Sequence, residues 1–374
     1  MAMRRRIVIA GGGTGGHLYP GIALARELME RDREIEISFV GTRQGIESRV
    51  LPMEGFDLKI IPAGGLVGKR GIERWSSWFK LPFGLADSLC FLLKKRPNLV
   101  VGVGGYASGP LALSAGILKI PLLIHEQNSI PGMTNRLLGK IANKVAVSFK
   151  QSIDYFPKEK VEVTGNMIRK EFQKVESPEL PRGEKFCVLV FGGSQGARSI
   201  NRAIVDALVH LIDFKARLHF IHQTGEADRE EIEESYAVKG FSSEVRPFFF
   251  DMAGCYRRAS LVICRAGATT LAEVTASGKA SVLIPFPQAT HNHQAKNAEA
   301  LVAKNAAEVI YDNELDGKKM ADFIKDGLEN PAQLEELGRN SYRLGNRDAA
   351  KRVADLCVEL MKDGNHEFTE QGAL

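Results

Sequence analysis

The sequence predicts an α/β fold in which two doubly wound domains, each with a parallel sheet, follow one another along the chain. Three observations lead to this prediction. The chain has 374 residues, more than one hydrophobic core usually takes. Short β-branched runs alternate with longer segments of helical periodicity. The opening "RRIVIAGGGTGG" is echoed about 180 residues later by "KFCVLVFGGSQGA", and both stretches are typical of a strand, a glycine turn and a helix.

The predicted strands form two series. The first series covers 6–10, 36–40, 58–61, 99–103, 121–124 and 144–148, and the second covers 186–191, 217–222, 245–250, 261–264, 281–284 and 307–310. Apolar residues at helical spacing predict helices between them, for example over 20–31, 199–212 and 332–361. Alternation of this kind is typical of βαβ units, whose strands are parallel.

We place the first domain at residues 1–165 and the second at 166–344, with a link near 162–170. A C-terminal helix at about 345–361 is expected to pack back on the first domain. Open α/β sheets bind ligands beyond the carboxyl ends of their strands, so we expect both sheets to face a shared cleft.

Composition excludes several classes of protein. The 44% hydrophobic and 25% charged residues are typical of a globular protein, and no apolar run is long enough to predict a transmembrane helix or a signal peptide. Five widely spaced cysteines without a C-x-x-C motif indicate reduced thiols. The net charge is +5, and the segment 66–96 alone has seven basic and two acidic side chains. A dedicated nucleic-acid module is not indicated.

The stretch "GGGTGGH" at 11–17 has the glycine spacing of a dinucleotide site. Such a site also needs an acid at the end of the second strand, where this chain has Gly41-Thr42-Arg43. A Walker loop would need Lys-Ser or Lys-Thr where His17-Leu18 stands. The loop is therefore either a positive-φ turn that binds nothing or a helix N-terminus for an oxygen-rich ligand. His17 is correspondingly either a helix-start residue bonded to backbone or a base.

The second half has a similar ambiguity. In "CRAGATTLAE" (264–273), Thr270 and Glu273 have the spacing of a capping box, or else the helix start holds a diphosphate while Glu273 accepts bonds from a ribose. "HNHQAKNA" supplies His293, Gln294 and Asn297, which suit sugar hydroxyls. Glycine loops at 102–110 and 192–197 repeat the design and favour a ligand with phosphates.

Three candidate metal motifs are incomplete. "HEQNS" has Ser129 where H-E-x-x-H needs a second histidine, and the loop beginning "DNELDG" has Phe323 where an EF-hand needs Glu. His291-x-His293 has no evident third ligand. We therefore expect no required metal.

Eight motifs together resemble the MurG family of bacterial peptidoglycan N-acetylglucosaminyltransferases. They are "GGGTGGH", "GVGGYASGP", "IHEQNSIPG", "VTGNMIR", "FGGSQGA", "FFFDM", "CRAGATTLAE" and "HNHQAKNA", in order over about residues 5–360. The resemblance implies the GT-B fold and inverting, metal-independent transfer of GlcNAc from UDP-GlcNAc to the C4 hydroxyl of the MurNAc in undecaprenyl-diphospho-MurNAc-pentapeptide (lipid I), giving lipid II. It implies no cofactor and no nucleic acid, with other cell-wall and division proteins as candidate partners.

The resemblance also implies roles for single residues. His17 is the expected catalytic base. The expected donor-binding residues are Thr14, Gly15, Gly16, Asn128, Arg169, Ser194, Phe249, Ala268, Thr269, Thr270, Leu271, Ala272, Glu273 and Gln294. In this chain Phe249 stands where an aliphatic residue is common, and His293 stands where some members have a second glutamine. The expected acceptor-binding residues are Gly104, Gly105, Tyr106 and Ser108.

The lipid-linked acceptor suggests a function for the basic segment 66–96. Trp75, Trp78, Phe79 and Lys80 are expected to meet the anionic cytoplasmic face of the bacterial inner membrane, as a peripheral contact. The alternative is an ordinary helix packed on the sheet. For the whole chain, two other functions stay open: a UDP-GlcNAc 2-epimerase of the same fold, and a non-catalytic nucleotide-sugar sensor.

Overall fold

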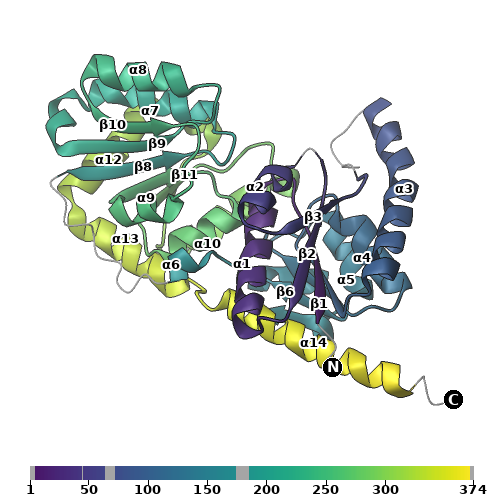
Figure 1. Ribbon diagram of the computed structural model, residues 1–374. Helices are drawn as coiled ribbons and strands as arrows, with labels where there is room; N and C mark the ends of the chain where they lie inside the picture. Colours follow the sequence, from purple (N-terminus) through teal and green to yellow (C-terminus); the bar gives the residue numbers. More distant parts are fainter. Residues whose placement is uncertain (1–4, 44, 64–71, 174–184, 371–374) are drawn as a thin grey trace. The chain divides into compact units, whose positions relative to one another are not determined.

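The computed structural model describes residues 5–43, 45–63, 72–173 and 185–370, and the chain divides into two compact units (Figure 1). The first unit comprises Met1–Arg169 and Asp348–Leu374, and the second comprises Lys170–Arg347. Each unit contains one sheet in which neighbouring strands are parallel. The two parallel sheets confirm the predicted fold class. In the part of the chain that is described, no helix is both long and apolar enough to cross a membrane.

The sheet of the first unit has the strand order β3-β2-β1-β4-β5-β6-β7. Its strands are β1 Arg6–Ala10, β2 Glu36–Gly41, β3 Asp57–Ile60, β4 Leu99–Gly102, β5 Leu122–Glu126, β6 Lys144–Val147 and β7 Val161–Val163. The first six were predicted to within a few residues. The three-residue β7 was missed, because an edge strand this short leaves little pattern in the sequence.

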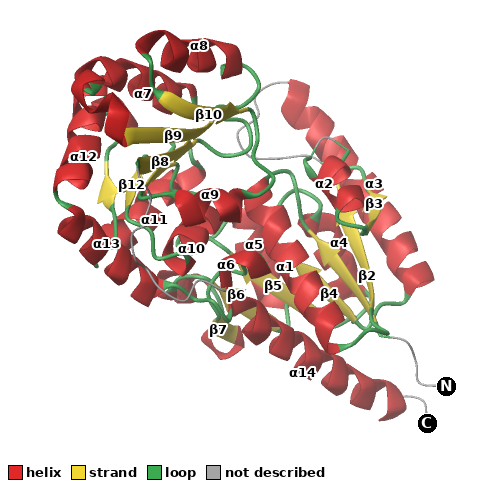
Figure 2. Ribbon diagram, turned by 60° about the vertical axis from the view of Figure 1, so that its left-hand side comes forward, coloured by secondary structure: helices red, strands yellow, loops and turns green. Residues whose placement is uncertain are grey.

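Helices cover both faces of this sheet (Figure 2). They are α1 Gly15–Arg31, α2 Glu47–Met53, α3 Ile72–Lys95, α4 Ser108–Ile117, α5 Met133–Ile141 and α14 Ala349–Glu370. Helix α1 begins five residues before the predicted position 20. Thr14 is its extended N-cap, so the last glycines of the loop already belong to the helix.

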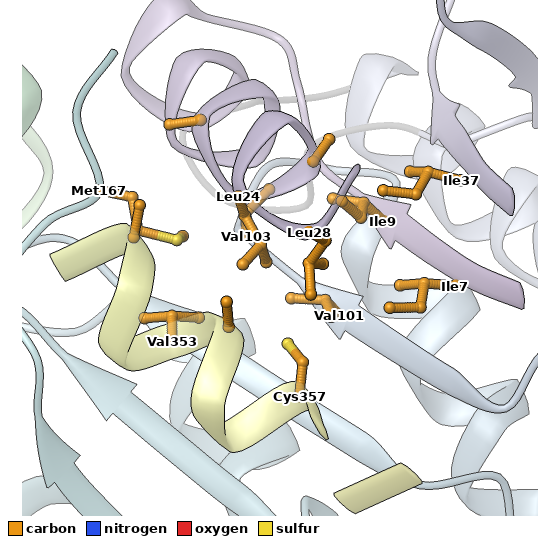
Figure 3. Close-up of a cluster of buried hydrophobic side chains, with 14 of the residues drawn as sticks. Ile7, Ile9, Leu24, Leu28, Ile37, Val101, Val103, Met167, Val353 and Cys357 are labelled. Atoms are coloured by element: carbon orange, nitrogen blue, oxygen red, sulfur yellow. The ribbon is translucent and has the colours of Figure 1, made fainter. Parts of the chain in front are cut away.

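The C-terminal helix α14 belongs to the core of the first unit (Figure 3). Its buried Val353 and Cys357 lie four residues apart and therefore on one face. That face packs in one cluster with Leu24 and Leu28 of α1 and Val101 of β4. The predicted single helical stretch 332–361 is two helices, α13 Pro331–Leu344 and α14, separated near Gly345.

The sheet of the second unit has the order β10-β9-β8-β11-β12-β13. Its strands are β8 Phe186–Phe191, β9 Leu218–Gln223, β10 Ser242–Arg246, β11 Leu261–Cys264, β12 Ser281–Leu283 and β13 Glu308–Val309. Its helices are α6 Lys170–Gln173, α7 Arg198–His210, α8 Arg229–Lys239, α9 Met252–Arg258, α10 Ala268–Ala276, α11 His293–Val302, α12 Gly317–Glu329 and α13. The strand predicted at 245–250 was wrong for 247–250. Pro247 cannot donate to a sheet, and the strand ends before it.

In each sheet the strand order reverses at one place. It reverses between β1 and β4 in the first unit, and between β8 and β11 in the second. Loops that leave the carboxyl ends of strands at such a point diverge, and they form the usual ligand site of an open α/β sheet. The glycine loops at 11–14 and 103–107 follow β1 and β4, and the loops at 192–197 and 265–267 follow β8 and β11.

Candidate functional site

The glycine loop after β1 is held by a buried carboxylate that sequence reasoning missed. Glu47, the first residue of α2, is fully buried. Its Oε2 accepts a hydrogen bond from the Gly13 N–H at 2.7 Å, and its Oε1 accepts from the N–H and hydroxyl of Thr42 at 2.8 and 2.9 Å. A Cβ at Gly12, Gly41 or Gly45 would fall within 2.6 Å of this side chain. The glycines therefore make room for a carboxylate that belongs to the protein.

His17 lies in the first turn of α1, partly exposed. Its Nδ1 is 3.2 Å from Oε1 of Gln127. A Cβ on Gly104 would stand 2.6 Å from the same Nδ1, and Gly104 has a φ of +90°. The loop after β4 therefore needs glycine there so that the imidazole can lie against its backbone.

The loop after β4 has one exposed side chain among its predicted acceptor residues. Tyr106 is 55% exposed. Gly105 has a φ of +85°, and a Cβ on it would meet the Gly12 carbonyl oxygen at 2.4 Å, so this glycine allows the two loops to touch. Ser108 is fully buried, and its hydroxyl lies 2.7 Å from the Ala10 carbonyl oxygen and 2.8 Å from that of Gly104. Ser108 therefore holds the loop from inside, and its part in acceptor binding stays a prediction.

A second buried carboxylate organises the "HEQN" segment at the end of β5. Glu126 accepts hydrogen bonds from the Asn128 N–H at 2.9 Å, the Asn128 side chain at 3.2 Å and the Asn135 amide at 2.8 Å. Burial raises the pKa of Glu126, and these donors oppose that rise. Asn128, a predicted donor-binding residue, is thus fixed by a neighbour two positions earlier.

The remaining predicted residues of the first unit lie at the start of α1 and after β7. Thr14 and Gly16 are exposed, and Gly15 is partly exposed. Arg169 is partly exposed, and its guanidinium lies 4.6 Å from the ring centroid of Tyr19 on α1. The start of α1 is therefore accessible to solvent, and Arg169 lies beside it.

In the second unit the loop after β8 is braced by Gln223. The Gln223 amide donates to the Gly193 carbonyl at 2.8 Å, and its oxygen accepts from the Phe249 N–H at 2.9 Å. Ser194 is exposed on this loop. The Phe249 side chain is 6% exposed, whereas its neighbour Phe250 is 68% exposed. The Phe249 ring is therefore buried, and its backbone N–H is held by Gln223.

Helix α10 follows β11 after a short turn, with Gly267 as an N-cap that has an extended backbone. Thr270 is therefore inside the helix, and the capping-box interpretation is wrong. Ala268, Thr269, Leu271 and Glu273 are buried, and Thr270 and Ala272 are partly exposed. The N-terminus of a helix attracts anions because its dipole and first N–H groups point there.

Arg265 fixes the turn before α10, and sequence reasoning did not single it out. Its guanidinium is 2.6 Å from Oδ1 of Asp312 and 2.8 Å from the Ser199 hydroxyl. It also donates at 3.2 Å to the carbonyls of Ile284 and Pro285 after β12. One buried side chain therefore ties the first turn of α7, the loop after β12 and the turn at Asp312 together.

Gln294 lies in the first turn of α11, and its Oε1 accepts from the Phe286 N–H at 2.9 Å. The preceding His291 and Asn292 have φ values of 54° and 55°. Two consecutive non-glycine residues in the left-handed region are strained, and such strain often accompanies a functional loop.

Two further expectations concern a metal ion and the basic segment 66–96. Among the described residues no group of three His, Cys, Asp or Glu has the geometry to hold a metal ion. The backbone of Trp75, Trp78, Phe79 and Lys80 lies in α3, but their side chains lie outside the described residues.

Comparison with known proteins places these two units in one family. Residues 7–147 match the glycosyltransferase family 28 N-terminal domain, and residues 187–353 match the family 28 C-terminal domain. A curated relative from Myxococcus xanthus is 48% identical over 95% of this chain and 93% of its own. It is named UDP-N-acetylglucosamine--N-acetylmuramyl-(pentapeptide) pyrophosphoryl-undecaprenol N-acetylglucosamine transferase.

Solved structures agree with this assignment. The structure of Acinetobacter baumannii MurG is 29% identical, with a TM-score of 0.74 over 94% of this chain and 99% of its own. A UDP-N-acetylglucosamine 2-epimerase at 12% identity has a TM-score of 0.69 over 96% of each chain, a likeness of fold alone. The chain belongs to glycosyltransferase family 28 and, within it, to the MurG family of N-acetylglucosamine transferases.

Proposed function

We propose that this chain transfers GlcNAc from UDP-GlcNAc to the C4 hydroxyl of the MurNAc residue in lipid I, giving lipid II. The observation that carries the proposal is the 48% identity, over 95% of the chain, to a relative named for this transfer. The local geometry supports it, because both units present glycine loops at the reversal of their strand order.

The chemistry assigned to the first unit is proton removal. In an inverting transfer the acceptor oxygen bonds to the anomeric carbon while the bond from that carbon to the diphosphate oxygen breaks. The departing electron pair goes to UDP, and the proton of the acceptor hydroxyl goes to a base. His17 suits this role because it is partly exposed and its ring is fixed by Gln127 and the Gly104 backbone.

The chemistry assigned to the second unit is stabilisation of the leaving diphosphate. We assign this to the N-terminus of α10, where the helix dipole favours negative charge without a cation. Glu273 is the proposed acceptor for the ribose hydroxyls, and Ser194 and Gln294 are proposed donor contacts. On this basis the transfer requires no metal, and its rate should be unchanged by a chelator.

The test uses radiolabelled UDP-GlcNAc and a lipid I analogue with purified full-length protein. We expect label in a lipid II analogue, and a His17→Ala variant should be about 10²- to 10⁴-fold slower. Label found in UDP-N-acetylmannosamine, or in N-acetylmannosamine released from it by hydrolysis, would indicate a 2-epimerase, and binding without turnover would indicate a sensor. A His17→Ala variant with near-normal turnover would reject the base assignment.

We also propose that the first unit binds the anionic cytoplasmic face of the membrane peripherally. Three apolar side chains of α5 recur every four residues and are exposed: Met133, Leu137 and Ile141. Arg136 and Lys140 lie between them, and Ile117 of the neighbouring α4 is also exposed. An exposed apolar row flanked by basic residues favours a lipid surface that carries negative charge.

A further inference from the structure

A continuous chain of hydrogen bonds runs through the first unit from a backbone carbonyl to His17. The Gly165 carbonyl oxygen is 3.2 Å from Nε2 of His125, whose Nδ1 is 3.1 Å from Nε2 of Gln127. Oε1 of Gln127 is in turn 3.2 Å from Nδ1 of His17. His125 and Gln127 are 0% and 1% exposed, so water has little access to compete for these contacts.

Which atom donates in each hydrogen bond follows from the oxygens in this chain, because they can only accept. A carbonyl oxygen accepts and never donates, and the Val103 carbonyl is 2.7 Å from Nε2 of Gln127. The amide NH₂ must therefore face Val103, which turns Oε1 toward His17. Because Oε1 also only accepts, Nδ1 of His17 carries the proton of a neutral ring, and the ring's lone pair lies on Nε2.

The hydrogen bonds of His125 lead independently to the same orientation of the Gln127 amide. The Gly165 carbonyl requires a proton on Nε2 of His125, so Nδ1 of a neutral His125 is an acceptor. Gln127 offers an N–H to that acceptor. Burial lowers the pKa of His125 to about 4, which keeps the ring neutral near pH 7. The carbonyls of Val103 and Gly165 therefore each require the same orientation of the Gln127 amide.

We propose that Gln127 is a positioning residue that, backed by His125, holds His17 in the Nδ1–H tautomer and so presents Nε2 as the base. This inference rests on the proposed transfer. Orientation of a catalytic imidazole by a hydrogen bond to its second nitrogen is a general device, and its loss leaves the base in the wrong tautomer. Here the orienting group is a neutral amide, which selects the tautomer without adding a charge.

The tautomers can be measured without substrate. The chain has eight histidines, and ¹⁵N labelling of their rings with long-range ¹H–¹⁵N spectra shows which nitrogen carries the proton. His17→Ala and His125→Asn spectra assign the two signals. Above pH 7 we expect His17 protonated on Nδ1 and His125 on Nε2. A wild-type His17 protonated on Nε2 would overturn the inference, whatever the variants do.

Two variants of Gln127 separate its roles. Gln127→Met keeps the side-chain length and offers no acceptor to His17, whereas Gln127→Glu keeps an acceptor there. We expect Gln127→Met to shift His17 toward Nε2–H and to lower kcat about 10- to 100-fold. Thermal unfolding first establishes that Gln127→Glu is folded. This variant should keep His17 as Nδ1–H. Loss of the tautomer preference in Gln127→Glu, or its persistence in Gln127→Met, would contradict the proposal.

A double-mutant cycle gives the matched control. In a His17→Ala background, Gln127→Met should cost no further activity, because the residue that it positions is gone. If Gln127→Met lowers activity as much in this background as in the wild type, Gln127 acts through the loop structure instead. That result would overturn the inference. If His17→Ala alone leaves turnover intact, the proposed base and the catalytic part of this inference fail together, while the tautomer spectra still decide the hydrogen-bond chain.

Discussion

The carboxylate of Glu47 accepts a hydrogen bond from the backbone N–H of Gly13 across 2.7 Å. The same side chain accepts two bonds from Thr42, so it joins the glycine loop after β1 to the loop after β2. In a dinucleotide site, loop N–H groups face the pyrophosphate of the ligand. Here one of them is already occupied by a carboxylate of the protein, which keeps the loop shape without any ligand.

Replacing Glu47 with Gln should therefore damage the glycine loop. An amide puts an NH₂ group against either the Gly13 or the Thr42 N–H, and a buried donor left without an acceptor costs about 1–3 kcal/mol. We expect a loss of that size in the free energy of unfolding, measured with urea, and a lower kcat because His17 follows the loop directly.

Glu34→Gln is the matched control for this variant. Glu34 is exposed near the start of β2, so its replacement makes the same change of charge without touching the loop. It should leave both stability and turnover close to wild type. Equal stability of Glu47→Gln and Glu34→Gln would show that the carboxylate does not hold the loop.

Gly104→Ala should impair turnover by displacing the His17 ring. The new methyl would stand 2.6 Å from Nδ1, and the loop backbone has a φ of +90°. A displacement of about 1 Å in a catalytic group can cost roughly 10²-fold in rate, and we expect a loss of kcat of that order.

Gly55→Ala separates the effect of backbone strain from that of the ring contact. Gly55 also has a positive φ, +76°, but a Cβ there meets nothing within 4 Å. Both variants should lose about 1 kcal/mol of stability from the left-handed backbone. Steady-state kinetics should then show normal turnover for Gly55→Ala, and a normal kcat in Gly104→Ala would contradict the predicted contact.

The fold was largely predictable because its signals are local. Apolar runs such as 6–10 and 186–191 match strands β1 and β8, since a buried parallel strand is apolar along its whole length. The failures also have local causes. The run of three phenylalanines after Pro247 has the composition of a strand but follows a residue that cannot continue one. The short edge strand β7 is set by its neighbour β6 more than by its own residues.

The site was predictable in part. The place of the glycine loops, and of His17 beside one of them, was predictable because glycine spacing after a strand is visible in the sequence. Glu47 was not, since its role depends on two loops that meet only when β1 and β2 pair. Arg265 was missed for the same reason, because its partner Asp312 is 47 residues away. The inward position of the Ser108 side chain was not predictable either, since a motif does not show which side chains point inward.

The exposed row on α5 predicts binding to anionic vesicles. Leu137 and Ile141 are 60% and 45% exposed, and we expect Leu137→Ser with Ile141→Ser to weaken cosedimentation with vesicles that contain phosphatidylglycerol. Val238→Ser on α8 is the control, because Val238 is a more exposed apolar residue of the other unit. Equal binding by the two variants would argue against a lipid contact at α5, and binding to neutral vesicles as strongly as to anionic ones would exclude a role for charge.

Stability should depend on pH through a buried histidine of the second unit. His222 is fully buried in the second unit, where Nε2 faces Oδ1 of Asn201 at 3.1 Å and Nδ1 faces the Tyr236 hydroxyl at 3.1 Å. Burial lowers its pKa from 6.5 to about 3. The unfolded chain therefore binds a proton at His222 at a pH where the folded chain does not.

The sign and size of the effect follow from linkage. Stability contributed by neutral His222 is present above pH 6.5 and is lost as the pH falls toward 3. Between pH 7 and pH 5 wild type should lose about 2 kcal/mol more than a His222→Gln variant, because only the wild type has this proton to bind on unfolding. Urea unfolding followed by circular dichroism at both pH values measures the difference. His125 and Glu126 also titrate differently on folding, in opposite directions, but both proteins share them, so their effects cancel. Parallel pH dependence of the two proteins would show that His222 is not held neutral in the folded state.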